Sequence, residues 1–315
     1  MPLGIKPTVD YAFKKIFGTR ENRTAVIGLL NAILTLPRPV DDVEIVNPFS
    51  RKEFLSDKQI VVDIRARDEE GRWLNVEMQV DVRPGLIQRL AYYGCSLYVQ
   101  QLEAGADYRK LTPAFSICLL RNALFRDGHA AHHRFRLADL EHGRTLSDTI
   151  EVHTVELTKY NVDEYRLTHA SEIEKWAFFL LHADRYDAGR LRELLPGAPF
   201  QQAIADVETI AGRTEDRLMY DQREKALRDH KWAIESARDE ARAEGLAEGR
   251  AEGRAEGHAE GLAEGVLIGK IQVLQQLLGE PETPATTLDA CSIDELRSQV
   301  TELQDRLRRR GTLPG

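Results

Sequence analysis

Two carboxylates, Asp63 and Glu77, flank a predicted tight turn, and Gln79 stands two residues beyond the second of them. The segments that carry them alternate apolar and polar side chains, which predicts two β-strands. Gly71 in the connecting segment favours a hairpin turn. If the hairpin is regular, Asp63 lies directly opposite Glu77 on the polar face, with their Cβ atoms about 4.5–5.5 Å apart.

Two carboxylates at that distance repel each other, and a divalent cation removes the conflict. Mg²⁺, or Mn²⁺ in its place, binds through one or two carboxylates and keeps several waters, one of which can attack a phosphodiester. Gln79 points to the same face and can hydrogen-bond the attacking water or a phosphate oxygen. The alternative is a solvated hairpin face whose charges are balanced by Arg65, Arg67 and water. The spacing alone leaves both interpretations open.

The elements that must position this pair are expected to form a mixed α/β sheet domain at residues 1–160. Hydrophobic spacing predicts each helix and strand, and turn residues mark where they end. The predicted order is a short helix before Gly18, a helix at 21–34, strands at 43–46, 59–67 and 73–81, a helix at 85–103, and strands at 114–120 and 149–157.

The chain after residue 160 is predicted to be helical, with a helical region at 161–242, a tandem repeat at 243–266 and a helical tail at 267–315. The repeat consists of six copies of AEGx. Each glycine costs about 1 kcal/mol relative to alanine, so the repeat should not be a stable helix in isolation. Two interpretations stay open: a glycine stripe along which helices of a homo-oligomer approach closely, or a low-complexity spacer.

The net charge of −8 is unevenly distributed. Residues 1–121 hold 17 lysines and arginines against 15 aspartates and glutamates, a net charge of +2, so residues 122–315 carry −10. The global charge therefore does not exclude DNA binding by the N-terminal part.

Other features of the sequence exclude several classes of protein. The three cysteines are scattered, which argues against a disulfide framework or a zinc site. The histidines in the segment RDGHAAHHRF have no ligand-spaced partner and are expected to lie in a loop. No stretch of about 18 apolar residues predicts a membrane span, so we expect a soluble protein of the cytoplasm.

A resemblance to a known family weighs on the carboxylate pair. The segments VDYAFKKIFG, VVDIRARDEEGRWLNVEMQV and QRLAYYGCSLYVQQL resemble the Rpn family of recombination-promoting nucleases and transposases. This family is a branch of the PD-(D/E)XK superfamily, and the resemblance covers roughly residues 6–160. It implies a restriction-endonuclease-like mixed sheet flanked by helices, followed by an all-helical C-terminal extension.

The resemblance also implies roles for individual residues. In the superfamily pattern an acidic residue on one strand is followed by (D/E)-x-K on the next, which corresponds to Asp63, Glu77 and Gln79. Glutamine departs from the lysine of that pattern. Asp10 is a weaker third acidic candidate, for which a helix-start carboxylate is the alternative. Arg89 and Tyr92 could contact a phosphate, with ordinary helix packing as their alternative.

Together these inferences predict a Mg²⁺- or Mn²⁺-dependent DNA endonuclease, acting as a homo-oligomer in recombination, mobile-element biology or defence. Asp63 and Glu77 would bind the metal. Nothing in the sequence marks the strand-joining ability of a transposase proper. The alternative is a catalytically weak interaction protein that keeps the nuclease fold and acts through the glycine repeat. Metal-dependent cleavage separates the two.

Overall fold

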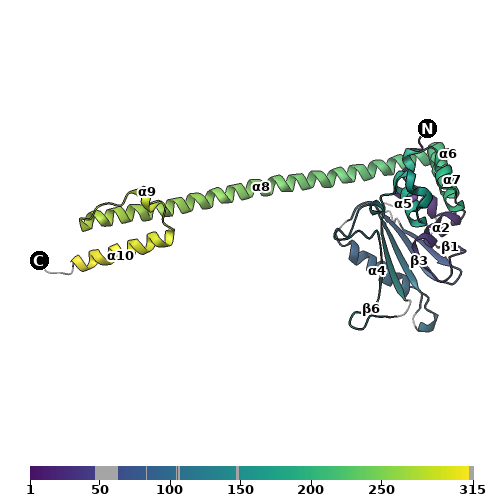
Figure 1. The fold of residues 1–315 in the computed structure, drawn as a ribbon, viewed down its shortest axis with the longest axis horizontal. Helices are drawn as coiled ribbons and strands as arrows, with labels where there is room; N and C mark the ends of the chain where they lie inside the picture. Colours follow the sequence, from purple (N-terminus) through teal and green to yellow (C-terminus); the bar gives the residue numbers. More distant parts are fainter. Residues whose placement is uncertain (47–62, 83, 104, 106, 147–148, 312–315) are drawn as a thin grey trace. The chain divides into compact units, whose positions relative to one another are not determined.

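The computed structural model describes residues 1–46, 63–82, 84–103, 105, 107–146 and 149–311. The first part of the strand that the sequence predicts at 59–67 lies outside these residues. Six strands form one sheet (Figure 1). In spatial order they are β1 (Val43–Ile45), β2 (Asp63–Asp68), β3 (Trp73–Gln79), β4 (Ala114–Leu120), β8 (Ile150–Glu156) and β5 (His132–Arg136).

The sheet is mixed, as the sequence predicted. Strands β3, β4 and β8 are parallel neighbours, whereas β1–β2, β2–β3 and β5–β8 are antiparallel pairs. Helix α4 (Leu86–Val99) makes the crossover that a parallel β3–β4 pair requires. Short strands β6 (Ala138–Asp139) and β7 (Arg144–Thr145) form a separate pair.

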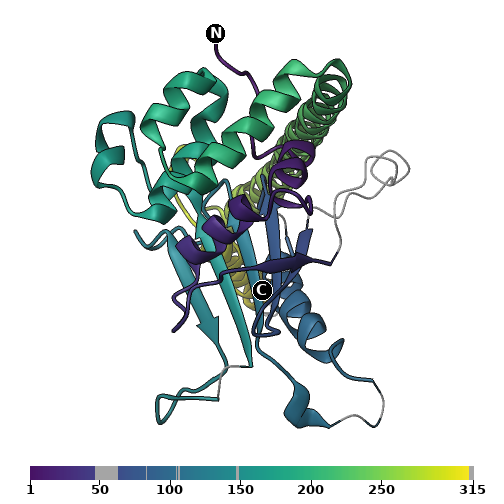
Figure 2. The same ribbon diagram turned by 90° about the vertical axis from the view of Figure 1, so that its right-hand side faces the viewer.

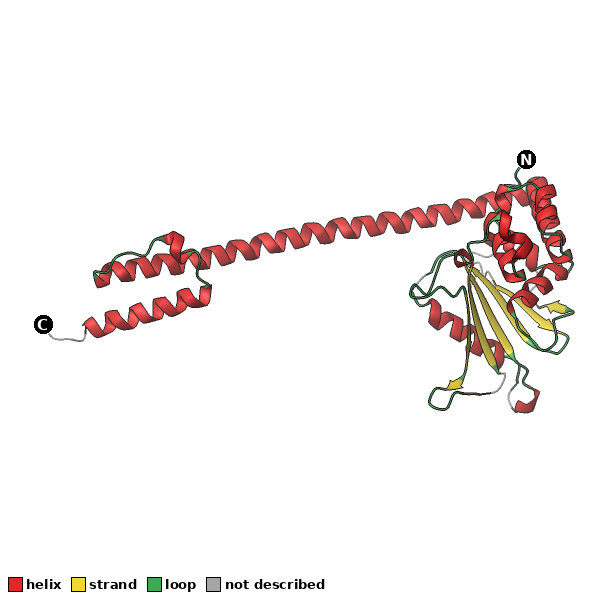
Figure 3. Ribbon diagram, viewed as in Figure 1, coloured by secondary structure: helices red, strands yellow, loops and turns green. Residues whose placement is uncertain are grey.

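Helices cover both faces of this sheet (Figures 2 and 3). One face packs against α1 (Asp10–Phe17), α2 (Arg23–Ile33), α5 (Glu172–His182) and α7 (Ala198–Gly212), and α6 (Ala188–Leu194) packs on α7. The other face packs against α4, where Leu90 contacts the layer that contains Cys118. Alternate residues of β3 therefore face two different layers: Leu74 and Val76 enter the larger core, and Glu77 faces the α4 side.

The chain divides into two compact units, Met1–Arg228 and Asp229–Gly315. The sequence placed the end of the nuclease-like domain at residue 160, whereas the packing of the first unit continues to Arg228. The reason is that α5 and α7 complete the core of α1 and α2. The fully buried Trp176 ring lies 5.5 Å from the Phe17 ring and 4.3 Å from the Phe200 ring, measured between centroids.

The AEGx repeat is helical and lies inside α8 (Thr214–Leu278). No described atom lies within 4 Å of where a Cβ would stand at any of its six glycines. The sequence predicted that such a repeat needs support to form a helix. Packed segments supply it by nucleating the helix at each end: the Tyr11 hydroxyl donates to Asp216 near its start, and Ile271 is fully buried near its end.

The second unit has a small core of its own. The last turns of α8 pack against α10 (Ile293–Gly311), and the short helix α9 (Ala285–Leu288) adds Leu288 to the same cluster. Leu296 is fully buried there, whereas Asp294 is exposed, which agrees with the amphipathic tail helix that the sequence predicts.

The contact between α2 and α7 depends on a glycine. A Cβ at Gly28 would lie 2.4 Å from Cβ of Pro199 and 3.4 Å from the Trp176 ring. We expect Gly28→Ala to lower the free energy of unfolding of the first unit by about 1–3 kcal/mol, because a proline ring cannot rotate away from the added methyl. Urea unfolding followed by near-ultraviolet circular dichroism measures this.

Gly212→Ala is the matched control for that substitution. Gly212 is also helical and a Cβ there would meet no described atom within 4 Å. This variant should be neutral or stabilised by up to about 1 kcal/mol. Equal stabilities of the two variants would show that the α2–α7 contact does not require glycine.

Candidate active site

The predicted hairpin forms with the predicted register. Asp63 pairs with Glu77 and Arg65 with Asn75 across β2 and β3. Gly71 adopts a φ of 78° in the connecting turn, a conformation that glycine reaches without strain. The backbone therefore places the first acidic residue directly opposite the second, although the side chain of Asp63 lies outside what the structure describes.

The Glu77 side chain is almost fully enclosed, with 5% of the residue exposed. Two donors hold one of its carboxylate oxygens. The Gln79 Nε2 donates to Glu77 Oε1 at 2.5 Å, and Arg89 Nη2 donates to the same oxygen at 2.9 Å. Burial of a carboxylate is costly unless such partners or a cation compensate it. Glu77 is thus a buried, oriented carboxylate rather than part of a solvated hairpin face.

Gln79 is the last residue of β3, and its contacts explain how it orients the site. Its side-chain amide nitrogen donates to Glu77, while its backbone carbonyl accepts from the Arg121 N–H at 3.0 Å. The amide thus directs Glu77. The role predicted for Gln79, orienting a water or a phosphate oxygen, stays a prediction.

Arg89 comes from α4, the helix that covers this face of the sheet. Its side chain is 37% exposed, so the guanidinium reaches both the buried Glu77 and the surface. The guanidinium carbon also lies 5.9 Å from the centre of the Tyr93 ring, one helical turn away. Packing between the helix and the hairpin places this cation, and the sequence spacing alone could not show that Arg89 meets Glu77.

Cys118 lies beside Glu77 on the parallel strand β4. Burial raises the pKa of its thiol far above the ordinary range, and the negative charge of Glu77 raises it further. Burial therefore favours the neutral thiol over the thiolate, which is the nucleophilic form. Its role here is to form an apolar neighbour of the carboxylate.

Asp10 is the third acidic residue that the sequence predicted for the site. Asp10 begins α1, whose apolar side chains pack on the sheet face opposite to that of Glu77. Its carboxylate accepts the Tyr11 N–H at 2.8 Å. Burial raises the pKa of Asp10, while the Tyr11 N–H and the charges of Arg223 and Lys14 lower it. These contacts agree with a helix-start carboxylate, and a catalytic role for Asp10 stays a prediction.

Tyr92 follows Arg89 on α4 and is 67% exposed, with its ring 6.0 Å from that of Tyr93. A phosphate contact from this ring stays a prediction. Arg67 lies on the same sheet face as Glu77 and stands 5.9 Å above the centre of the Trp73 ring. It is exposed and adds a second cation to this face.

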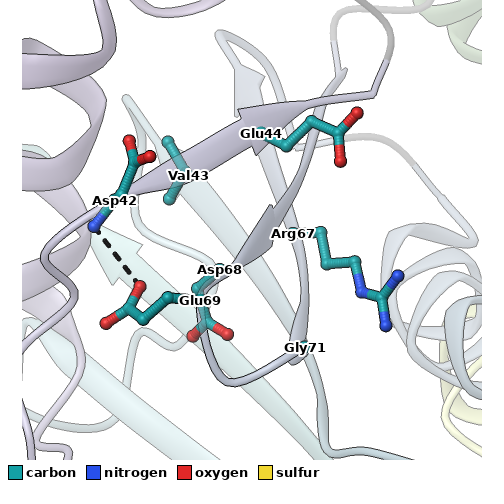
Figure 4. A pocket seen from close by; sticks show the side chains of 7 residues that line it. All are labelled: Asp42, Val43, Glu44, Arg67, Asp68, Glu69 and Gly71. Carbon is teal, nitrogen blue, oxygen red and sulfur yellow. Dashed lines mark hydrogen bonds between the residues drawn. The ribbon is translucent and has the colours of Figure 1, made fainter.

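A separate pocket of about 280 Å³ lies at the turn of the hairpin (Figure 4). Three of its acidic side chains, those of Asp42, Asp68 and Glu69, have hydrogen-bond partners. Asp42 accepts two hydrogen bonds from Arg23, and Asp68 is bonded to Arg72. Figure 4 shows the Asp42 N–H bonded to Glu69, whose carboxylate also accepts the Asp41 N–H. These contacts connect the segment before β1 to the hairpin turn.

Within the described part of the chain, no group of three or more histidine, cysteine, aspartate or glutamate side chains could hold a metal ion. This finding excludes, among the described residues, a zinc site built from three or more such side chains. It does not bear on a Mg²⁺ site, which needs only one or two carboxylates together with waters. Carboxylate oxygens are hard ligands of the kind that such a cation prefers, and the role of Asp63 and Glu77 as metal ligands stays a prediction.

The sequence predicted that the histidines of the segment RDGHAAHHRF lie in a loop, and this prediction is wrong for two of them. His132 and His133 lie in β5, and His132 Nε2 is 2.8 Å from His153 Nδ1 on β8. The same His153 is bonded to Glu151, which also binds Arg136. Burial, together with the charges of His153 and His133, lowers the pKa of His132 to about 4. Residues about 20 positions apart meet here, which local spacing could not reveal.

Comparison with known proteins agrees with this arrangement of strands and helices. A family model described as PD-(D/E)XK nuclease family transposase matches residues 7–237. The chain belongs to this nuclease family. The match covers the sheet, the hairpin and the helices α5 to α7, so membership in the PD-(D/E)XK nucleases extends past residue 160. It confirms the family resemblance and the fold class that the sequence predicted.

Neither the curated proteins nor the solved structures contain a match to this chain. Within the described residues, no helix is long and apolar enough to cross a membrane. The family match over residues 7–237 is the finding that supports a nuclease-type function.

Proposed function

We propose that this PD-(D/E)XK family protein is a DNA endonuclease that depends on Mg²⁺ or Mn²⁺ and hydrolyses phosphodiester bonds. The observation that carries the proposal is the register that sets Asp63 opposite the buried Glu77 in a chain of this nuclease family. Asp63 and Glu77 would hold the metal. A bound cation would supply positive charge for the scissile phosphate and a water of lowered pKa.

The chain's own residues orient this site. Arg89 and Gln79 both donate to Glu77 Oε1, which restricts the direction of the carboxylate. Such outer partners of a metal ligand contribute strongly to affinity and activity. Glutamine cannot supply the positive charge of the lysine in the superfamily pattern. We propose that Arg89 supplies it, because its partly exposed guanidinium lies beside Glu77 and can bind a phosphate oxygen.

The remaining inferences from the sequence are proposals of the same kind. Action in recombination, mobile-element biology or defence is supported by the transposase branch of the family. Self-association along residues 243–266 is supported by the open space around the glycines of α8. A site in the cytoplasm agrees with a role on cellular DNA.

The proposal is tested by nicking of supercoiled plasmid by the full-length protein. We expect conversion to open circles with Mg²⁺ or Mn²⁺ and none with EDTA, because the carboxylates need a cation to act on a phosphodiester. Gel electrophoresis of time points measures the rate. Absence of cleavage with every divalent cation tried would instead favour an interaction protein that keeps the nuclease fold.

A further inference from the structure

A second cavity lies at the edge of the sheet where the parallel strands end. It has a volume of about 460 Å³, within the range of small-molecule sites. Its walls come from the segment after β8 and from α5 with the turn that follows it. The lining residues are Asn161, Val162, Asp163, Glu164, Tyr165, Arg166, Phe178, His182, Arg185 and Tyr186.

The aromatic side chains of this cavity differ in exposure. The ring of Tyr165 is 91% exposed, whereas Phe178 is buried and its ring lies 5.6 Å from that of Tyr186. An exposed ring beside an aromatic wall offers a stacking surface for a planar group. Bases of single-stranded nucleic acid bind such surfaces, since every base has an aromatic face.

Among the described residues, the cavity carries two arginines without an ion-pair partner and one carboxylate, that of Asp163, that accepts only a backbone N–H. Glu164 is bonded to Arg190, and Asp163 accepts the Arg166 N–H at 3.1 Å. By contrast, the guanidinium groups of Arg166 and Arg185 make no hydrogen bond or ion pair within the part of the chain that the structure describes. Both arginines are exposed. The cavity therefore presents two cations to an anionic ligand.

His182 adds a buried polar nitrogen to the cavity. Its buried Nδ1 has no hydrogen-bond partner among the described residues. Burial lowers the pKa of His182, and the charge of Arg185, followed by that of Arg121, lowers it further, while Asp184 raises it. A polar nitrogen without a partner and a surplus of cations favour a ligand that carries a phosphate group.

The cavity and the candidate active site adjoin the same end of the sheet. Gln79, Leu120 and Glu156 stand side by side at the carboxyl ends of β3, β4 and β8. Ligands of parallel sheets bind at this edge. Arg121, directly after β4, donates its N–H to Gln79 and acts electrostatically on His182. The cavity lies on the α5 side of the sheet, whereas Glu77 faces the α4 side, so a nucleic-acid strand that reaches both sites must pass around this edge.

We propose that this cavity binds one nucleotide of a single-stranded or frayed segment of the nucleic-acid substrate, with its base on Tyr165 and its phosphate on Arg185 and Arg166. The proposal rests on the proposed nuclease function. It specifies the substrate: the enzyme acts on DNA that contains an unpaired nucleotide.

Binding of a fluorescein-labelled oligothymidylate to the full-length protein in EDTA tests this, measured by fluorescence anisotropy at low salt. Tyr165→Ala should weaken binding about tenfold, because stacking of one base contributes roughly 1–3 kcal/mol. Tyr165→Phe should bind like the wild type, since it keeps the ring. Tyr108→Ala is the matched control, because Tyr108 is 81% exposed and lies outside the cavity.

Arg185→Ala supplies a readout that a structural role would not change. Loss of one phosphate contact should reduce the slope of log affinity against log salt concentration by about 0.7 for single-stranded DNA. Arg213→Ala, an exposed arginine outside the cavity, should leave the slope unchanged. The proposal is overturned if the wild type does not bind the oligonucleotide, or if the Tyr165 and Arg185 variants bind with unchanged affinity and slope.

The binding assay and the cleavage assay can fail separately. Binding that depends on Tyr165 and Arg185 in a protein that never cuts would support the cavity and remove the nuclease proposal. Metal-dependent cleavage together with binding that ignores both residues would keep the nuclease and remove the cavity proposal.

Discussion

Glu77→Gln is expected to reduce the metal-dependent nicking rate roughly 10³-fold. Glutamine keeps the shape of the side chain but loses the negative charge that would hold the cation. A cation contributes several kcal/mol of charge stabilisation, and each 1.4 kcal/mol corresponds to about tenfold in rate. Asp63→Asn should have an effect of the same order, because Asp63 lies opposite Glu77 in the hairpin. Initial rates of plasmid nicking measure both variants.

Glu70→Gln is the matched control within the same hairpin. Glu70 is exposed in the turn and pairs with the buried Arg72, which also binds Asp68. This variant should nick like the wild type, because Arg72 keeps its ion pair with Asp68 and the Glu70 side chain is largely in solvent. Unchanged far-ultraviolet circular dichroism of every variant establishes that the fold is retained. A Glu77→Gln protein that cuts at the wild-type rate would refute the assignment of the hairpin carboxylates.

Trp176→Ala is expected to lower the free energy of unfolding of the first unit by about 3–5 kcal/mol. The Trp176 ring is buried among Phe17, Phe179 and Phe200, with centroid distances of 5.5, 5.7 and 4.3 Å. Its removal leaves a cavity where α5 meets α1 and α7, which those aromatic rings cannot fill. Urea unfolding followed by circular dichroism measures the change.

Trp232→Ala removes the same side chain from an exposed position in α8, where Trp232 is 73% exposed. Its effect should stay within about 0.5 kcal/mol. A large loss at Trp176 with none at Trp232 would show that α5 and α7 are integral to the nuclease fold. A loss below about 1 kcal/mol at Trp176 would support the domain end at residue 160 that the sequence predicted.

The candidate site was accessible from the sequence because a hairpin is a local structure. The alternation of side chains and the turn at Gly71 are encoded within about 20 residues, and they determine that Asp63 meets Glu77. The buried strand at Ala114–Leu120 was likewise predicted with its observed bounds, since a continuous apolar run reflects burial on both faces.

Contacts between distant residues could not be predicted in this way. The pairing of His132 with His153 requires β5 to pair with β8, and the local periodicity of apolar residues does not encode which strands pair. The same holds for the domain boundary. The apolar faces of α5 and α7 are visible in the sequence, but only packing shows that they complete the core of α1 and α2 rather than a separate region.

The sequence by itself determined the α/β order, the resemblance to the PD-(D/E)XK nucleases and the facing carboxylates, because period, turn chemistry and motif spacing are properties of short segments. The tertiary structure decided what surrounds the Glu77 carboxylate. It set Arg89 against Glu77 and placed the cavity of Tyr165 and Arg185 at the strand ends. These arrangements depend on how helices pack on the sheet, which hydrophobic patterning alone does not specify.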